Sequence, residues 1–173
     1  GQHEGWAALY AGLAGAAHCI LIPEVPYNVN DVCALVERRR KQGKEYTLIV
    51  MAEGARPDNL KTYKVKTEMD EYGNELAIGA SEWLAEKILK KTKIDTRNVV
   101  LSSILRGGTP TIFDRMLGLK YGASAVELAA AGNFGTMVSI HAMDIHPIQL
   151  EEAVKERHRV PLDLFKKMLL YVK

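Results

Sequence analysis

The chain has 173 residues, of which 47% are hydrophobic and 25% charged, so it is long enough to bury a sizeable core. Its formal net charge is only +2, which excludes the strongly basic surface of a typical nucleic-acid-binding protein. No apolar run approaches the roughly 20 residues that a membrane span needs, and no signal peptide is visible. We therefore expect a cytoplasmic protein that binds neither membranes nor nucleic acid.

The first part of the chain alternates helical and strand patterns. Residues 6–17 are rich in Ala and Leu and predict a helix. The apolar run 19–22 predicts a short buried strand that ends at Pro23. Residues 28–42 predict an amphipathic helix, and residues 47–52 predict a second buried strand. The apolar stripe of the helix consists of Val29, Val32, Cys33 and Val36.

The middle of the chain combines a polar stretch with a helix and a strand. Residues 56–79 contain alternating side chains and a Gly73-Asn74 turn, which favour a surface hairpin. An apolar helix face runs from Ala80 to Ile88. Residues 99–101 predict a third buried strand.

The last part of the chain begins with a helix. Thr109 and Pro110 predict its cap and its first residue, and the helix runs towards Ala131 with a break near Gly122. The remaining predicted elements are a strand over 137–140 and helices over 148–156 and 161–171.

Short buried strands that alternate with helices are typical of a parallel sheet covered on both faces. We therefore predict a single α/β domain over residues 1–173, built as a three-layer α/β/α sandwich with a mainly parallel sheet. Cys19 and Cys33 lie in apolar segments, and we expect buried thiols rather than a disulfide or a metal site.

Two segments at the ends of predicted strands carry residues suited to ligand binding. In open α/β sheets, ligands bind outside the carboxyl ends of the strands. Glu53 directly follows one strand, and the segment Arg106-Gly-Gly-Thr-Pro110 follows another. Glycines let the backbone approach a ligand, a helix N-terminus favours an anion, and a guanidinium matches phosphate oxygens. Arg115, further along the helix, could return to the same region.

The types of residue in these segments indicate which class of ligand they would bind. An ionised Glu only accepts hydrogen bonds, so Glu53 beside arginines suits a sugar phosphate better than inorganic phosphate. Each feature also has a purely structural explanation: a Gly-rich turn with two surface arginines, and a carboxylate that caps a helix or pairs with an arginine. His141 and His146 flank Asp144, but their spacing matches no strong zinc pattern, so we predict no metal site.

The segment Arg106–Arg115 also resembles a known family. Its sequence, Arg-Gly-Gly-Thr-Pro-Thr-Ile-Phe-Asp-Arg, is similar to the phosphofructokinase pattern Arg-Gly-Gly-Ser/Thr-Pro-x-x-Phe/Tyr-Asp-Arg. Shorter segments resemble the same family in the same order, so the resemblance covers essentially the whole chain. The bacterial subgroup that uses ATP or pyrophosphate is the most similar. The shorter segments are Gly1–Trp6, Ile20–Glu24, Val50–Gly54 and Gly135–Val138.

The resemblance implies an activity and a set of site residues. 6-Phosphofructokinases transfer a phosphoryl group from ATP or pyrophosphate to the 1-hydroxyl of fructose 6-phosphate in glycolysis, with Mg²⁺ at the donor phosphates. By resemblance, Glu53 binds the sugar hydroxyls, and Arg106 and Arg115 bind the 6-phosphate. Gly1 and Gln2 would lie against the sugar. Family members use the Arg106-type residue across a subunit interface, which implies a homo-oligomer, either a dimer or a tetramer.

The family's Gly-Gly-Asp donor loop and Thr-x-Asp-x-Asp catalytic segment do not occur in these residues. We therefore expect no catalytic residue and no metal ligand in this chain, which would supply the C-terminal, sugar-phosphate-binding half of the enzyme. Mg²⁺ and ATP or pyrophosphate would bind mainly through an N-terminal phosphofructokinase half. Alone, the chain is expected to be inactive.

Several positions depart from the family pattern. Gln2 stands where the family usually has Arg, and Ser103 and Leu105 replace the usual His and Gln. At the regulatory phosphate site of some bacterial members, Lys44 matches a Lys but His18 replaces a Glu, which predicts a vestigial effector site. Two readings follow: the acceptor-binding half of a kinase, or a non-catalytic sugar-phosphate-binding or regulatory module.

Overall fold

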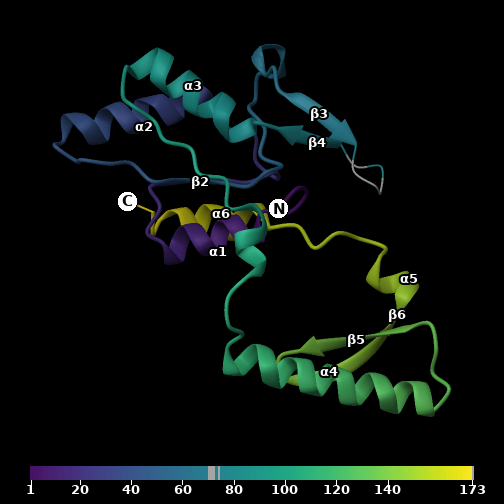
Figure 1. The fold of residues 1–173 in the computed structure, drawn as a ribbon. Coiled ribbons are helices and arrows are strands. Elements are labelled where there is room, and N and C mark those ends of the chain that lie inside the picture. Colours follow the sequence, from purple (N-terminus) through teal and green to yellow (C-terminus); the bar gives the residue numbers. More distant parts are fainter. Residues whose placement is uncertain (70–72, 74, 173) are drawn as a thin grey trace. The chain divides into compact units, whose positions relative to one another are not determined.

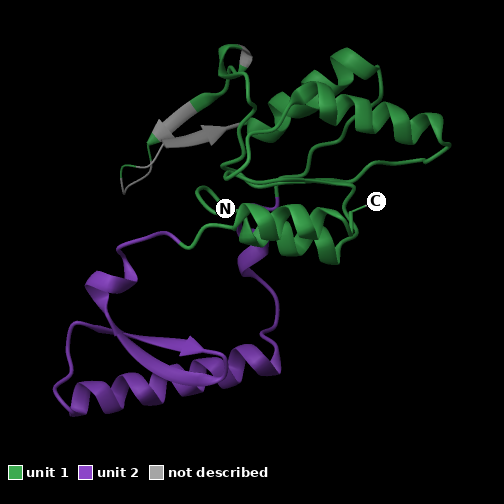
Figure 2. Ribbon diagram, turned by 180° about the vertical axis from the view of Figure 1, so that it is seen from behind, with its two compact units in different colours: residues 1–100, 158–173 green, residues 101–157 purple. Residues whose placement is uncertain are grey.

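The computed structural model describes residues 1–69, 73 and 75–172. It divides into two compact units (Figure 2). Unit 1 contains Gly1–Val100 and His158–Lys173, and unit 2 contains Leu101–Arg157. The sequence predicts one domain, whereas the contacts separate into these two groups. Because the end of the chain returns to unit 1, unit 2 is an insertion in the sequence of unit 1.

Unit 1 is a three-layer arrangement around a parallel pair of strands. Its helices are α1 (Trp6–Ala14), α2 (Val29–Lys41), α3 (Ala80–Thr92) and α6 (Leu162–Leu169). The strands β1 (Cys19–Leu21) and β2 (Ile49–Met51) pair in parallel, with Ile20 opposite Val50. α1 and α6 cover one face of the pair, and α2 and α3 cover the other (Figure 1). This arrangement confirms the predicted α/β fold.

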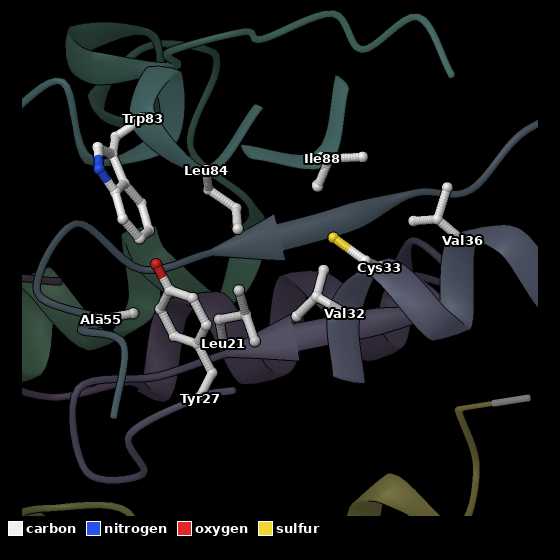
Figure 3. Close-up of a cluster of buried hydrophobic side chains, with 9 residues drawn as sticks. All are labelled: Leu21, Tyr27, Val32, Cys33, Val36, Ala55, Trp83, Leu84 and Ile88. Carbon is white, nitrogen blue, oxygen red and sulfur yellow. The ribbon is translucent and has the colours of Figure 1, made fainter. Parts of the chain in front are cut away.

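Both faces of the strand pair are buried. Leu21 packs with Trp83 and the other apolar side chains of α2 and α3 in one cluster (Figure 3). The neighbouring Ile20 points to the opposite face and packs with Leu9 of α1 and Phe165 of α6. Because successive side chains of a strand alternate between faces, burial on both sides explains why β1 and β2 have uninterrupted apolar sequences.

Local sequence explains where the central helices begin. The Asn28 side chain accepts a hydrogen bond from the Asn30 N–H at 2.8 Å and caps α2. Gly79 precedes α3 with φ of +82°, a conformation that favours glycine. The apolar faces predicted for these helices are the buried ones, namely Val32, Cys33 and Val36 in α2, and Trp83, Leu84 and Ile88 in α3.

A surface hairpin follows β2. β3 (Lys66–Met69) and β4 (Glu75–Ile78) pair antiparallel, which confirms the predicted hairpin. A one-turn helix, η1 (Leu60–Thr62), precedes it. Gly73 has φ of +79°, as many tight turns require. Asn74, the other residue of the predicted turn, lies outside the described residues.

Unit 2 contains a long helix and a second hairpin. α4 (Ile112–Ala130) continues through Gly122, where the sequence predicts a break. β5 (Thr136–His141) confirms the strand predicted over 137–140, and it pairs antiparallel with β6 (Asp144–Gln149). A short helix, α5 (Leu150–Ala153), ends the hairpin.

One predicted strand is wrong, and one predicted helix is shorter than expected. Residues 99–101 form no strand, and Val99 is 76% exposed. An apolar run becomes a strand only where a neighbouring strand pairs with its backbone groups. The helix predicted over 148–156 forms only as the short α5, over Leu150–Ala153, because the residues up to Gln149 belong to β6. Pro147 disfavours the helical conformation of the residue before it, and an edge strand tolerates proline.

Burial separates the two units. Every residue of both buried clusters belongs to unit 1, whereas no residue in 101–157 is buried. In α4, Ile112 is 83% exposed and Val126 is 70% exposed. Across the described ranges, no helix combines the length and the apolar character needed to cross a membrane.

Candidate functional site

The carboxyl ends of β1 and β2 lead into two loops that run side by side. Glu24 follows β1, and Glu53 follows β2. The loops are joined where the Tyr27 N–H donates to the Arg56 carbonyl at 3.1 Å and the Asp58 N–H donates to the Tyr27 carbonyl at 2.9 Å. In an open α/β sheet, this end of the strands is where ligands bind.

The first residues of the chain lie against this edge. The Gly54 N–H donates to the Gly1 carbonyl at 2.9 Å. A Cβ atom on Gly54 would lie 1.8 Å from the Gln2 carbonyl oxygen, so no larger residue fits without moving that backbone. The structure therefore brings together Gly1, Gln2 and Glu53, three of the site residues that the sequence predicts.

The Glu53 carboxylate is available to a ligand. The side chain is exposed and makes no hydrogen bond or ion pair within the part of the chain that the structure describes. It neither caps a helix nor pairs with an arginine, which were its structural alternatives. Its own backbone is held instead, because Arg56 Nη1 donates to the Glu53 carbonyl at 3.0 Å and to the Ala55 carbonyl at 3.2 Å.

The role of Arg56 is not predictable from the sequence alone. Its guanidinium lies over the Tyr63 ring, 5.7 Å from the centroid, and Tyr63 packs edge-to-face on Trp83. Burial raises the pKa of Tyr63, and Arg56 acts in the opposite direction. The only sequence signal was the position of Arg56 directly after the Glu53 segment. Arg56 thus couples the backbone at Glu53 to the apolar core.

The two predicted phosphate ligands lie on unit 2. Arg106 ends the short helix η2 (Ser102–Arg106), and Arg115 lies in the first turn of α4. Both side chains are exposed, and neither guanidinium makes a hydrogen bond or ion pair with any described residue. A guanidinium with unused donors matches the oxygens of a phosphate.

The turn between these arginines needs one of its glycines for conformation. Gly108 has φ of +94°, in the region that L-residues avoid, whereas a Cβ on it would meet open space. The requirement at Gly108 is therefore the backbone angle and not a close neighbour. Gly107 has φ of −93°, which other residues adopt readily.

The start of α4 differs from the prediction. The cap is Thr111 and not Thr109, and Pro110 lies outside the helix. Thr111 and Asp114 form a reciprocal capping box, in which Thr111 N–H and Oγ1 donate to Asp114 Oδ2 at 2.8 and 2.7 Å. The hydrogen bonds from the Thr111 side chain and backbone lower the pKa of Asp114. The ionised carboxylate of Asp114 therefore occupies the helix terminus at which the sequence predicts a bound anion.

The predicted effector residues lie at the opposite end of the strands. The Leu48 N–H donates to His18 Nδ1 at 2.9 Å, and the His18 ring packs against Tyr46. Desolvation, and then the charge of Arg39, lower the pKa of His18. The Lys44 N–H donates to the Arg39 carbonyl at 3.0 Å. A neutral His18 that accepts a backbone hydrogen bond cannot act as the carboxylate it replaces.

The candidate metal ligands do not come together as a metal site in the described part of the chain. Among the described residues, no three His, Cys, Asp or Glu side chains come together in a way that could hold a metal ion. His141 and His146 face each other across the β5–β6 hairpin, with ring centroids 6.2 Å apart. Burial raises the pKa of the Cys19 thiol to about 11, and also raises that of Cys33. Both cysteines are free thiols.

Comparison with known proteins places these residues in a family. The phosphofructokinase family model matches residues 1–129, a range that includes all five predicted substrate-binding residues. An ATP-dependent 6-phosphofructokinase of Mycobacterium leprae (strain TN) is 42% identical over 161 residues, which span 93% of this chain and 47% of that protein. A pyrophosphate–fructose 6-phosphate 1-phosphotransferase of Amycolatopsis mediterranei (strain S699) is also 42% identical, over 95% of this chain and 48% of its own length. The chain thus spans about half the length of the curated relatives it matches.

Solved structures agree on the fold. Phosphofructokinase from Saccharomyces cerevisiae superimposes with a TM-score of 0.70 at 27% identity, over 90% of this chain and 19% of that one. The pyrophosphate-dependent phosphofructokinase from Marinobacter aquaeolei has a TM-score of 0.74 at 22% identity, over 99% of this chain and 45% of that one, and supports the fold alone. Sequence and fold agree, and the chain belongs to the phosphofructokinase family.

Proposed function

We propose that this chain is the acceptor-binding half of a 6-phosphofructokinase. It binds fructose 6-phosphate for transfer of a phosphoryl group from ATP or pyrophosphate to the 1-hydroxyl, as a cytoplasmic enzyme of glycolysis. The observation that carries the proposal is the family match over residues 1–129. That match includes an exposed carboxylate and two exposed arginines of the kinds that a sugar phosphate requires.

The proposed roles follow from chemistry. Glu53 accepts hydrogen bonds from the sugar hydroxyls, because an ionised carboxylate has only acceptors. Arg106 and Arg115 hold the 6-phosphate through charge-assisted hydrogen bonds. Gly1 and Gln2 present their backbone beside Glu53, close to where the hydroxyls would bind. Phosphoryl transfer depends largely on positioning and electrostatic stabilisation, and this chain supplies them for the acceptor.

We assign binding of the phosphoryl donor to a different part of the enzyme. The described carboxylates and histidines do not fit a metal site, because no three of them come together. We therefore place Mg²⁺ and the ATP or pyrophosphate on an N-terminal phosphofructokinase half. That assignment agrees with the relatives, which are about twice the length of this chain. Since the family uses its Arg106-type residue across a subunit interface, we also propose a homo-oligomer.

Control through the family's effector site is proposed to be weak or absent. His18 is engaged with the Leu48 N–H, and its pKa is lowered. The side chain therefore does not provide the negative charge of the Glu it replaces, and its Nδ1 is already occupied by the Leu48 N–H. A steep response of the complete enzyme to a nucleoside diphosphate or phosphoenolpyruvate that is lost in Lys44→Ala would contradict this assignment.

A second function is favoured by three substitutions. Gln2 replaces an Arg, and Ser103 and Leu105 replace a His and a Gln of the family pattern. A lost charged hydrogen bond is worth about 1.5–3 kcal/mol, enough to impair catalysis while binding persists. The alternative is a non-catalytic phosphofructokinase-like module that binds or senses a sugar phosphate.

One assay separates the two functions. The chain is combined with a donor-binding half, and fructose 1,6-bisphosphate is measured with ATP and with pyrophosphate. A kinase gives product with at least one donor, and Arg106→Ala and Arg115→Ala each lower kcat/KM by at least about tenfold. The matched control is Arg97→Ala, which removes an exposed arginine of unit 1 and leaves the rate unchanged. Sugar-phosphate binding without turnover favours the module, and absence of both contradicts the proposal.

A further inference from the structure

Glu24, at the carboxyl end of β1, binds two backbone segments from opposite ends of the chain. Its Oε1 accepts the Gly5 N–H at 3.0 Å and the Val160 N–H at 2.9 Å. Its Oε2 is buried and has no hydrogen-bond partner in the described part of the chain. One carboxylate oxygen thus joins the residue before α1 to the segment that leads into α6.

A second contact supports the same junction. The Trp6 Nε1–H donates to the His158 carbonyl at 2.6 Å. The Trp6 and His158 rings are stacked, with centroids 5.0 Å apart. Residues 158–160 therefore contact the start of α1 through both Trp6 and Glu24, and the junction does not depend on a single hydrogen bond.

The backbone at this junction is closely packed. A Cβ atom on Gly5 would lie 2.4 Å from Ile22 Cβ and 2.9 Å from Glu24 Oε2. Val160 is only 2% exposed, so its N–H has no access to water as a substitute acceptor. Loss of the Glu24 carboxylate would leave two backbone donors unsatisfied in a tightly packed region, which is costly.

The segment Gly1–Gly5, which precedes α1, leads directly to the candidate site. It is held at one end by Glu24 through Gly5, and at the other by the Gly54 N–H through Gly1. Gln2 lies in between, against Gly54. Because the segment is short and fixed at both ends, release of Gly5 would also loosen the backbone at Gly1 and Gln2. Glu53 precedes the residue to which that backbone is bound.

We propose that Glu24 is a positioning residue for sugar-phosphate binding, which it supports by holding Gly1 and Gln2 against Glu53-Gly54. It acts through backbone contacts and does not touch the ligand. Val160 shares its oxygen, so the carboxyl-terminal segment helps to order the acceptor site. The inference rests on the proposed function, because the ordered segment lines the site assigned to fructose 6-phosphate.

Three substitutions of Glu24 separate the effect of side-chain length from the effect of the negative charge. Glu24→Gln keeps the Oε1 acceptor at the same length, so it rescues the contact without the charge. Glu24→Asp keeps the charge but is one methylene shorter and cannot reach both donors. Glu24→Ala removes the acceptor. The matched control is Glu45→Ala, which removes an exposed glutamate of unit 1.

The experiment measures amide hydrogen exchange and fructose 6-phosphate affinity for each full chain. In Glu24→Ala and Glu24→Asp, we expect the Gly54 amide to exchange about tenfold faster and fructose 6-phosphate to bind about tenfold more weakly. Glu24→Gln and Glu45→Ala should stay within about twofold of the wild type in both measurements. Amides of β1 and β2 report whether each variant remains folded.

The possible results are distinct. The inference is overturned if Glu24→Ala leaves Gly54 exchange unchanged, or if Gly54 exchange rises only in proportion to that of β1 and β2. It is equally overturned if Gly54 is released but fructose 6-phosphate binds as in the wild type. If the wild-type chain does not bind the sugar phosphate, the proposed function fails for the isolated chain. The Gly54 exchange then still decides whether Glu24 holds the segment.

Discussion

Unit 1 and unit 2 both contain apolar sequence, but only unit 1 buries it. Leu9 and Ile22 are 0% exposed in unit 1, whereas Ile112 and Phe134 in unit 2 are 83% and 77% exposed. The α1, β1, β2 and α6 segments of unit 1 meet in one cluster although they come from both ends of the chain. Unit 2 contains a capping box and a hairpin, which are local in sequence, and α4 contacts the hairpin without burying any residue.

The candidate site residues are divided in the same way. Gly1, Gln2 and Glu53 lie on backbone that long-range contacts hold in place. Arg106 and Arg115 lie on short-range structure with no buried residue beneath them. We therefore propose that the part of the site assigned to the sugar hydroxyls is ordered within this chain. The phosphate part depends on what covers unit 2 in the complete enzyme, for which we propose the N-terminal half or a second subunit.

The largest expected difference between the units is in amide exchange. Amides in β1 and β2 should exchange at least about 100-fold more slowly than amides in α4, because global opening is needed to expose the former. Hydrogen exchange measured by NMR or mass spectrometry on the whole chain tests this. Equal protection in both units would mean that unit 2 is ordered by contacts beyond its local structure.

A matched pair of truncations compares the cores directly. Leu9→Ala should lower the free energy of unfolding by about 2–5 kcal/mol, because it leaves a cavity under α1. Val126→Ala removes a side chain that is 70% exposed. It should change the free energy of unfolding by no more than about 0.5 kcal/mol. Urea unfolding checks both values. A large effect of Val126→Ala would show that α4 is buried in solution, for example by self-association.

Loss of a helix cap should act differently in the two units. Thr111→Ala removes the cap of α4 and Asn28→Ala removes that of α2, each at a cost of about 1 kcal/mol. In unit 2, the loss should appear as reduced helical circular dichroism without denaturant, because α4 has no buried residue to hold it. In unit 1, it should appear only as a lower urea midpoint. If Thr111→Ala and Asn28→Ala gave the same response, the two units would not differ in how their helices are supported.

The smallest predicted effect is on pH dependence in unit 1. The pKa of folded His18 lies below its ordinary value of about 6.5. The unfolded chain therefore binds more protons as pH falls, and the contribution of neutral His18 is present above pH 6.5 and lost below it. Urea unfolding between pH 8 and pH 5 should show a small decline that His18→Gln reduces. A His18 NMR titration at or above the ordinary value would contradict the assignment.

Sequence patterns predicted the elements of unit 1 because burial there follows regular periods. The runs at β1 and β2 are apolar on both faces, and the stripe of α2 repeats with the helical period. The patterns failed where pairing decides the structure. Residues 99–101 have a strand sequence without a partner strand, and β6 forms because β5 is available to pair with it.

The sequence predicted only those site residues that belong to recognisable motifs. Glu53, Arg106 and Arg115 stand out by residue type and by their position after predicted strands. Glu24 and Arg56 were missed because their roles depend on backbone atoms that only the fold brings near. The Glu24 partner Val160 is 136 positions away in the sequence. The start of α4 was misplaced because Thr109 and Thr111 are equally good caps, and Asp114 decides between them.

Calorimetric titration of the chain with fructose 6-phosphate tests the central claim most directly. Our account predicts saturable binding that weakens by about tenfold or more in Glu53→Ala of unit 1 and in Arg106→Ala of unit 2. Arg97→Ala should bind as the wild type does. Binding that neither site substitution affects would place the ligand elsewhere. No binding, either alone or with the N-terminal half present, would contradict the assignment of this chain as the acceptor-binding half.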